Sequence, residues 1–190
     1  MKNSSGFSLI ELLVAIAFLA IILVVLVGMI IQIFIQTGIS NEAYKAQDDA
    51  LVSMNYITKE LRQAADVIAA QPQSITIREY VSSGDAVPSQ VRFYLQGTNL
   101  MRGQIPPSGS APNYTYDSAS ETFKTLSTRV TNGANTIFTY YDQNNNQLTG
   151  TILLASVTLV STDLSFKQDQ RSKDLSVSTK VQLRFRKYNL

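Results

Sequence analysis

A run of twenty consecutive apolar residues, Leu12 to Ile31, constrains the fold of this 190-residue chain more than any other feature of its sequence. A helix rises about 1.5 Å per residue, so the run spans about 30 Å, the hydrocarbon thickness of a bilayer. Secretory signal peptides have shorter apolar regions of about 7–15 residues, followed by a small-residue cleavage site. Residues 32–36 offer no such cleavage site. The sequence therefore predicts one helix that crosses a membrane.

An acidic residue, Glu11, stands directly before this run, and Lys2 is the one cation upstream of it. A carboxylate within a bilayer costs roughly 2.5–3.5 kcal/mol on insertion scales, so we expect Glu11 to have a functional partner. The partner that we expect is the amino group of another chain. Lys2 on the short N-terminal side predicts a cytoplasmic N-terminus, which places residues 40–190 outside the cytoplasmic membrane.

The residues around Glu11 resemble the N-terminal signature of the type IV pilin and pseudopilin superfamily. In that family a short charged leader ends in Gly, Phe follows, and Glu stands five residues into the mature chain. Gly6, Phe7 and Glu11 match this pattern. The resemblance implies that a prepilin peptidase and methyltransferase removes the leader, residues 1–6, and methylates Phe7. It also implies that an inner-membrane assembly platform moves the helix into a filament with major and other minor pilins.

Cleavage would change the charge of Phe7. Its nitrogen is an amide before cleavage and an α-amine, mostly protonated at neutral pH, afterwards. The amine of an incoming subunit can then pair with Glu11 of a neighbour. In apolar surroundings such a pair is far stronger than in water, and an unpaired carboxylate is strongly unfavourable. Pairing would therefore fix the register of subunits along the filament axis.

The composition favours a structural subunit over an enzyme. The chain has no His and no Cys, which removes the usual general base, the commonest metal ligands, thiol nucleophiles and any disulfide. We therefore expect no catalytic residue, no metal site and no cofactor. Many pilins close a C-terminal loop with a disulfide, so this chain departs from the family there. Its formal net charge of +2 argues against wholesale coating of nucleic acid.

Helical periodicity continues beyond the apolar run. Apolar residues recur at three- and four-residue steps until the pair Gln71–Pro72 ends the pattern. These residues are Leu51, Met54, Leu61, Ala64, Ala65 and Ile68. We predict a helix from about Phe7 to Ala70. Residues 7–38 would form the transmembrane and filament-core half of this helix. The head would comprise residues 39–190, and residues 39–71 would form its amphipathic half-helix.

Two glycines, Gly28 and Gly38, weaken the predicted helix, each by about 1 kcal/mol relative to alanine. By resemblance, Gly28 could be the point where the helix melts in a filament. It could equally be a small residue that lets helices pack closely.

From Ser74 onward the hydrophobic period changes to two residues, which is typical of strands. We expect strands at residues 74–78 and 90–95, and a turn at Gly97–Asn99 that leads to residues 100–102 in a hairpin. A polar loop is expected over residues 105–120. Further strands are predicted at residues 136–141, 156–166 and 176–188. One long helix followed by an antiparallel sheet region, residues 74–190, is an α+β fold and, by resemblance, the pilin fold.

The predicted final strand alternates between polar or basic residues and apolar residues. One face carries Lys180, Gln182, Arg184 and Arg186, and the other carries Val181, Leu183 and Phe185. Further cations nearby are Lys167, Arg171, Lys173 and Lys187. A solvated sheet face is one interpretation of this pattern. The other is a contact with DNA phosphates or with an acidic partner subunit.

Two further patterns favour ordinary loop structure. Asp142, Asn144 and Asn146 have the first spacings of a calcium loop, but Gln147 stands where a glycine is needed. We therefore predict a polar hairpin tip there. The tyrosines of residues 113–116 would suit an adhesive or subunit contact, since tyrosine favours interfaces, but loop packing is the simpler expectation.

The head also resembles the larger minor pilins and pseudopilins, through the phrases VRFYLQGTNLMR, IFTYYDQNNNQLTG and VQLRFRKY. The resemblance therefore implies a minor pilin that starts, caps or enters a type IV pilus-like filament from the inner membrane. One alternative is a minor pseudopilin at the tip of a type II secretion system. Another is a DNA-uptake (competence) pilin that binds DNA, a less favoured partner, through its basic last strand.

Overall fold

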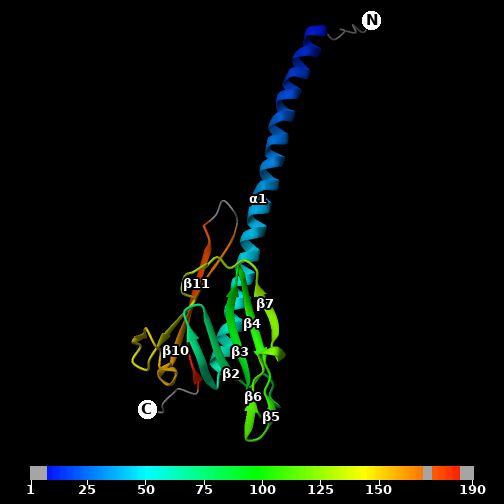
Figure 1. The fold of residues 1–190 in the computed structure, drawn as a ribbon. Coiled ribbons are helices and arrows are strands. Elements are labelled where there is room, and N and C mark those ends of the chain that lie inside the picture. Colours follow the sequence, from blue (N-terminus) through cyan, green and yellow to red (C-terminus); the bar gives the residue numbers. More distant parts are fainter. Residues whose placement is uncertain (1–7, 169–172, 185–190) are drawn as a thin grey trace. The chain divides into compact units, whose positions relative to one another are not determined.

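The computed structural model describes residues 8–168 and 173–184. The chain divides into two compact units, Met1–Glu42 and Ala43–Leu190. One helix, α1, comes first in the chain, and antiparallel strands follow it (Figure 1). The predicted α+β layout is confirmed.

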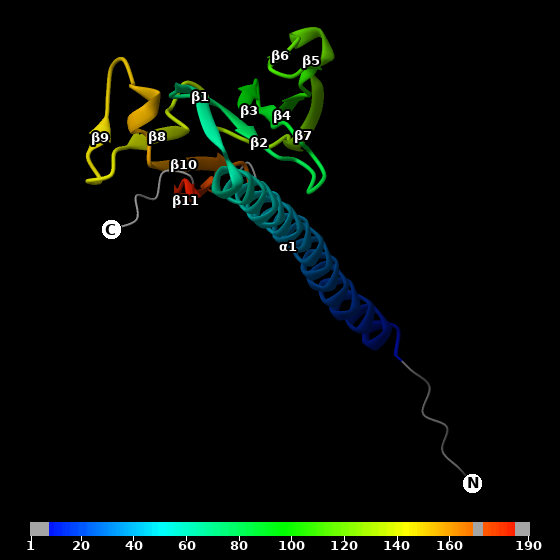
Figure 2. The same ribbon diagram turned by 90° about the horizontal axis from the view of Figure 1, so that it is seen from below.

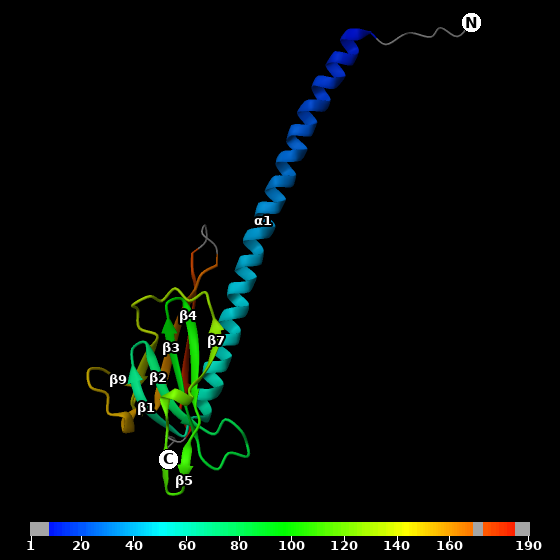
Figure 3. The same ribbon diagram turned by 45° about the vertical axis from the view of Figure 1, so that its right-hand side comes forward.

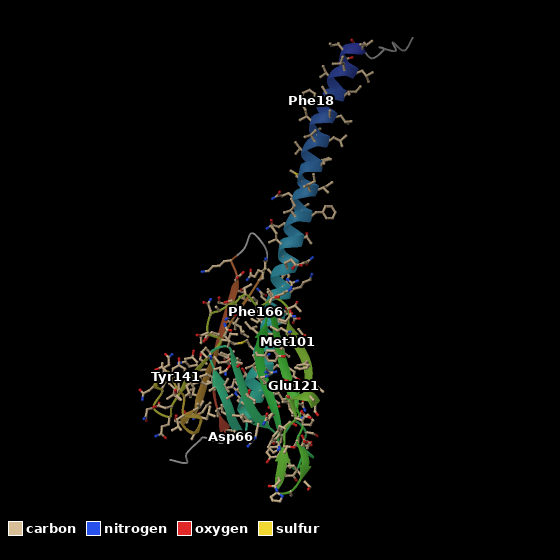
Figure 4. The ribbon with its side chains drawn as sticks, viewed as in Figure 1. Phe18, Asp66, Met101, Glu121, Tyr141 and Phe166 are labelled. Atoms are coloured by element: carbon tan, nitrogen blue, oxygen red, sulfur yellow. The ribbon has the colours of Figure 1, made fainter. Side chains whose placement is uncertain are left out.

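Helix α1 spans Leu9–Gln63, and the first unit contains its N-terminal part. From Ser8 to Gly38 every side chain is exposed. Phe18 is labelled on this part of the helix in Figure 4 and is 64% exposed. The helix is long and apolar enough to cross a membrane. An apolar surface of this extent requires lipid or other apolar helices to cover it.

Two larger antiparallel sheets form the second unit, with strand orders β1-β2-β3-β4-β7 and β11-β10-β8-β9. The first sheet contains β1 Asp66–Gln71, β2 Ser74–Glu79, β3 Ser89–Gln96, β4 Asn99–Ile105 and β7 Thr122–Ser127. The second contains β8 Phe138–Tyr141, β9 Gln147–Leu148, β10 Leu159–Phe166 and β11 Leu175–Gln182. The smaller elements are β5 Ser108–Ser110, β6 Asn113–Thr115, η1 Ser118–Ser120 and η2 Leu154–Ser156.

The last turns of α1 lie beside the two larger sheets in the views of Figures 2 and 3. Side chains from the helix and from both sheets form one hydrophobic core. The helix contributes Ala46, Ala50, Met54, Ile57 and Leu61, all buried. The sheets contribute, among others, Ile75, Val91, Phe93, Phe138, Val160 and Phe166. Burying one such large side chain is worth about 1.5–3 kcal/mol, so this helix face is integral to the second unit.

The turn between β1 and β2 joins the two sheets. The Pro72 carbonyl accepts hydrogen bonds from the backbone N–H groups of residues 137 and 138, at 2.7 and 2.9 Å. The Tyr140 hydroxyl lies 2.8 Å from the Gln71 carbonyl oxygen and 3.1 Å from that of Ser74. Burial raises the pKa of Tyr140, so its hydroxyl remains a neutral donor. The hydrogen bonds fix one sheet against the other.

The predicted end of the helix is wrong. Helix α1 ends at Gln63 rather than near Ala70, and Asp66–Gln71 forms strand β1. The Ala65 N–H donates to the Arg78 carbonyl at 2.7 Å, and β1 then pairs with β2 along its length. These cross-strand bonds take the place of the bonds that a longer helix would make.

The face predicted for the helix is also wrong at Leu51, which is 63% exposed. The buried stripe instead begins with the small residues Ala46 and Ala50, which are 0% and 2% exposed.

Most of the predicted strands are confirmed, with altered bounds: β2, β3 and β4 are longer than predicted, and β8 and β10 are shorter. The β3–β4 hairpin pairs Gln96 with Asn99 across a tight turn in which Gly97 has φ +65°. Strand β7 was not predicted, and the expected polar loop at residues 105–120 contains the β5–β6 hairpin and η1. The predicted extent of the last strand is wrong: β11 ends at Gln182, and residues 183 and 184 do not continue it. Residues 185–188 of the predicted strand lie outside the described residues.

Candidate functional site

The start of α1 carries a helix cap built from Ser8 and Glu11. The Ser8 carbonyl accepts a hydrogen bond from the Leu12 N–H at 3.2 Å, so Ser8 stands at the N-cap position. The Ser8 N–H donates to Oε2 of Glu11 at 3.0 Å. Ser followed three residues later by Glu is the spacing of a capping box. The sequence contained this signal, and our sequence reasoning did not use it.

The cap leaves part of the Glu11 carboxylate for another partner. A carboxylate offers about four lone-pair sites on two oxygens. The Ser8 N–H uses Oε2, and within residues 8–168 and 173–184 no hydrogen bond reaches Oε1. Glu11 can therefore keep its cap and still accept a bond from an ammonium group. The predicted cleavage and methylation residues, Gly6 and Phe7, lie outside the described residues.

Gly28 lies inside α1, and the helix continues through it without a break. A Cβ added at Gly28 would meet no atom within 4 Å. Within this chain, therefore, packing does not require a glycine at the position. Whether Gly28 melts in a filament stays a prediction.

Strand β11 has the alternation predicted for the basic strand. Lys180 and Gln182 are exposed, and Val181 between them is 1% exposed. The Lys180 ammonium group lies 4.2 Å from the centre of the Tyr141 ring, a cation–π contact across the sheet. Arg184 follows the strand and is also exposed. Arg186 lies outside the described residues.

The segment that resembles a calcium loop is a hairpin tip between β8 and β9, as predicted. Asp142 Oδ1 accepts hydrogen bonds from the N–H groups of Asn144 and Asn146, each at 2.8 Å. The backbone and side-chain bonds from Asn146 hold the pKa of Asp142 below its ordinary value. The carboxylate is thus committed to the turn. No group of three or more potential metal-binding His, Cys, Asp or Glu side chains occurs in the described part of the chain.

Tyr116 packs onto the head rather than projecting from it. Its hydroxyl donates to the Pro88 carbonyl at 2.8 Å, and the Arg78 guanidinium lies 5.4 Å from its ring centre. Tyr114, on β6, is 38% exposed. The expectation of loop packing therefore holds for Tyr116.

A buried charge cluster, not found from the sequence, lies between α1, β2 and β4. The Nε atom of Arg102 is 2.8 and 2.9 Å from the two carboxylate oxygens of Glu60, and its Nη2 is 3.6 Å from Oε1 of Glu79. Glu79 is 3% exposed and its Oε2 has no hydrogen-bond partner. Burial, and then the Glu60 carboxylate, raise the pKa of Glu79 to about 8. Two carboxylates thus share one guanidinium group.

The comparisons with known proteins concern the N-terminal segment. Residues 1–30 match the family model described as the prokaryotic N-terminal methylation motif. The match includes Gly6, Phe7 and Glu11 and nearly all of the apolar run. The comparison with curated proteins finds no match.

Proposed function

Residues 1–30 carry the prepilin-type signal of type IV pilins, and from this premise we propose that the chain is a minor pilin of a type IV pilus-like filament. Proteins with this motif are structural subunits rather than enzymes. The observation that carries the proposal is the motif, followed directly by an exposed apolar helix.

Processing would begin at the junction of Gly6 and Phe7. Prepilin peptidase would remove residues 1–6 and methylate the new α-amine of Phe7. Lys2 supports an orientation with this junction on the cytoplasmic side, where the leader is accessible to the enzyme. The head, residues 39–190, would then lie outside the inner membrane.

Glu11 would act in assembly through the charge that it keeps beside an apolar helix. Its cap to Ser8 orients the carboxylate at the first turn, and Oε1 remains for the ammonium group of an adjacent subunit. Removing either partner of an ion pair in apolar surroundings strongly destabilises the assembly, because the remaining charge is buried without a partner. A subunit out of register would leave Glu11 unpaired, so the pair selects one axial position.

The apolar part of α1 would exchange lipid contacts for contacts with neighbouring helices. Lipid tails and apolar side chains are similarly hydrophobic, so extraction into a bundle of such helices is not opposed by exposure to water. Assembly with major and other minor pilins on an inner-membrane platform would provide that bundle.

The proposal is tested by recovering surface filaments by shearing from cells that express the chain. We expect an antibody against the head to detect the chain in the sheared fraction, at a low ratio to the major subunit. Cells that lack prepilin peptidase should retain it in the membrane with its leader. Equal amounts in the sheared fraction with and without the peptidase would contradict the proposal. Recovery that depends on a type II secretion apparatus would instead assign it to a pseudopilus.

A further inference from the structure

A cavity of about 500 Å³ lies beside the buried cluster of Glu60, Glu79 and Arg102, within the second unit. All three charged side chains line it, and the remaining lining residues are Val52, Asn55, Tyr56, Lys59, Gln63, Val81 and Gln104. Ligand pockets in proteins typically have volumes of about 300–1,000 Å³. The cavity is therefore large enough to hold a long side chain or a small molecule.

One carboxylate oxygen in this cavity has no bonding partner. Glu79 is 3% exposed, and its Oε2 accepts no hydrogen bond from any residue that the structure describes. Its Oε1 lies 3.6 Å from Nη2 of Arg102, whereas the two Glu60 oxygens lie 2.8 and 2.9 Å from Nε. Arg102 is thus committed chiefly to Glu60. A buried polar atom without a partner is costly, so a donor that enters the cavity would be stabilised there.

The cluster also has one negative charge more than its single guanidinium group balances when both carboxyl groups are ionised. A buried charge without a counter-charge is strongly unfavourable, so the group either takes up a proton or pairs with a cation. Burial, and then the Glu60 carboxylate, raise the pKa of Glu79 to about 8, so a proton fills this role at neutral pH. A cation in the cavity would fill the same role and displace the proton.

Two further cations lie near the cluster. Lys59 of α1 lines the cavity, and the ammonium group of Lys124 on β7 lies 4.4 Å from the centre of the Tyr56 ring. Both lysines are exposed, so solvent screens their charges more than it screens the buried cluster. They weaken the attraction for a cation, but neither supplies the missing partner of Glu79 Oε2.

The other lining residues favour a guanidinium group on an aliphatic stem. Guanidinium is more weakly hydrated than ammonium and forms paired hydrogen bonds with a carboxylate, so it suits a buried site better. The amide groups of Asn55 and Gln63 offer further acceptors in the same cavity. Val52 and Val81 are 49% and 43% exposed, and an aliphatic stem with the surface around it would cover them. A small free cation would leave both valines in water.

We propose that this cavity receives an arginine side chain of another protein, with its guanidinium group paired to Glu79. The proton that Glu79 loses on pairing passes to solvent. Arginine is one of the residues that most often dominate the binding energy of protein interfaces. The inference goes beyond the filament role and does not rest on it.

The test uses the full chain in nonionic detergent and a capped pentapeptide, Gly-Leu-Arg-Leu-Gly, as the probe. The matched peptide carries citrulline, an uncharged urea of nearly the same shape, in place of arginine. Isothermal titration calorimetry, corrected with empty micelles, measures Kd. We expect the arginine peptide to bind at least about tenfold more tightly than the citrulline peptide. It should exceed n-butylguanidinium, a free cation that cannot cover the two valines, by a similar factor.

Proton release provides a second measurement, because the entering cation displaces the proton of Glu79. Titrations at pH 7 in two buffers of different ionisation enthalpy should show roughly 0.5–1 proton released per bound arginine peptide. At about pH 9.5 Glu79 is already ionised and arginine is still charged, so release should be close to zero. Since the proton no longer competes, the affinity should be about tenfold higher there than at pH 7.

Three variants are compared with the wild type at about pH 9.5, where Glu79 carries its charge. Glu79→Gln keeps the shape of the side chain without the charge and should weaken binding of the arginine peptide at least about tenfold. Lys59→Gln removes a like charge from the cavity and should tighten binding. Asp174→Asn is the matched control, an exposed carboxylate outside the cavity lining, and its Kd should stay within about twofold of the wild-type value. Circular dichroism checks that each variant is folded.

Four results would overturn the proposal. The first is equal affinity for the arginine and citrulline peptides, or no binding of either. The second is wild-type affinity in Glu79→Gln. The third is binding at pH 7 without proton release, which would pair the peptide with another group. The fourth is equal affinity for n-butylguanidinium and the arginine peptide, which would make the cavity a site for a free cation rather than for a protein side chain.

Discussion

Glu11 accepts a hydrogen bond from the backbone N–H of Ser8, three residues before it, through one of its two carboxylate oxygens. The carboxylate therefore has a structural partner within its own chain before any other subunit is present. This local bond places the negative charge at the first turn of α1, where the helix dipole also favours it. The proposed pairing with a neighbouring amine would add to this cap rather than replace it.

The two roles of Glu11 can be separated with Glu11→Gln and Glu11→Ala. Glutamine also serves in a capping box, so Glu11→Gln should keep the helix start but lose the charge. Glu11→Ala should lose both. We expect incorporation into sheared filaments, measured by immunoblot against the membrane pool, to fall strongly and to a similar extent in both variants.

Wild-type incorporation of Glu11→Gln would show that capping is sufficient and that the ion pair is not required. Phe18→Leu is a suitable control, because it changes an exposed apolar side chain on the same helix and leaves the charge unchanged.

A chain that begins at Gly38 should fold as a soluble protein. It lacks the exposed apolar part of α1 but keeps the buried helix residues from Ala46 to Leu61. A chain that begins at Ala64 should aggregate, because the core residues once covered by the helix become an exposed apolar patch. Circular dichroism and size-exclusion chromatography compare the two. Equal stability would mean that the second unit does not depend on its helix.

Gly103 on β4 should not tolerate a side chain. The Glu121 carboxylate lies where a Cβ at Gly103 would stand, and Arg92 Nη2 holds it at 2.9 and 3.0 Å (Glu121 is labelled in Figure 4). We expect Gly103→Ala to lower the free energy of unfolding by about 1–3 kcal/mol in urea titrations of the chain that begins at Gly38.

The collision can be checked by a double-mutant cycle with Glu121→Ala, which removes the displaced carboxylate. The two changes should be less than additive, and strict additivity would rule out the collision as the cause. Gly84→Ala serves as control, since a Cβ at Gly84 would meet no atom within 4 Å.

Glu79 should make the second unit less stable as pH rises towards 8. Its pKa is about 8 in the folded chain against an ordinary value of 4.5, so the folded state holds a proton that the unfolded state releases. The free energy of unfolding therefore falls between about pH 4.5 and about pH 8. Glu79→Gln should flatten this dependence and raise stability at pH 7 by about 1–3 kcal/mol.

Urea titrations at several pH values measure this dependence. Asp85→Asn changes an exposed carboxyl and should leave the profile of the wild type intact. A profile of Glu79→Gln that still falls between pH 4.5 and 8 would assign the effect to another group, of which Glu60, beside the same Arg102, is the first candidate.

The period of the apolar residues was sufficient to predict α1 and most strands, because each pattern is local. It failed at residues 64–71, where alanines and Ile68 fit a helix as well as a strand. There the pairing of β1 with β2 decides the structure, and a partner strand is not visible in a local pattern. Strand β7 was missed for the same reason, since its partner is β4.

The N-terminal signature can be recognised from the sequence alone, because Gly6, Phe7 and Glu11 lie within one motif of six residues. Their roles in cleavage, methylation and subunit pairing stay predictions. The cap of Glu11 to Ser8 was equally local and was overlooked. The cluster of Glu60, Glu79 and Arg102 could not be predicted, since folding brings its members together from distant segments.

The central claim is tested most directly by the mass of the mature N-terminal peptide. The chain is recovered from sheared filaments, digested, and analysed by tandem mass spectrometry, with membranes of a strain lacking prepilin peptidase as the reference. The account predicts a peptide that begins at N-methylated Phe7 in the filaments and an intact Met1–Gly6 leader in the reference. Filament material that retains the leader, or begins at an unmethylated residue other than Phe7, would contradict it.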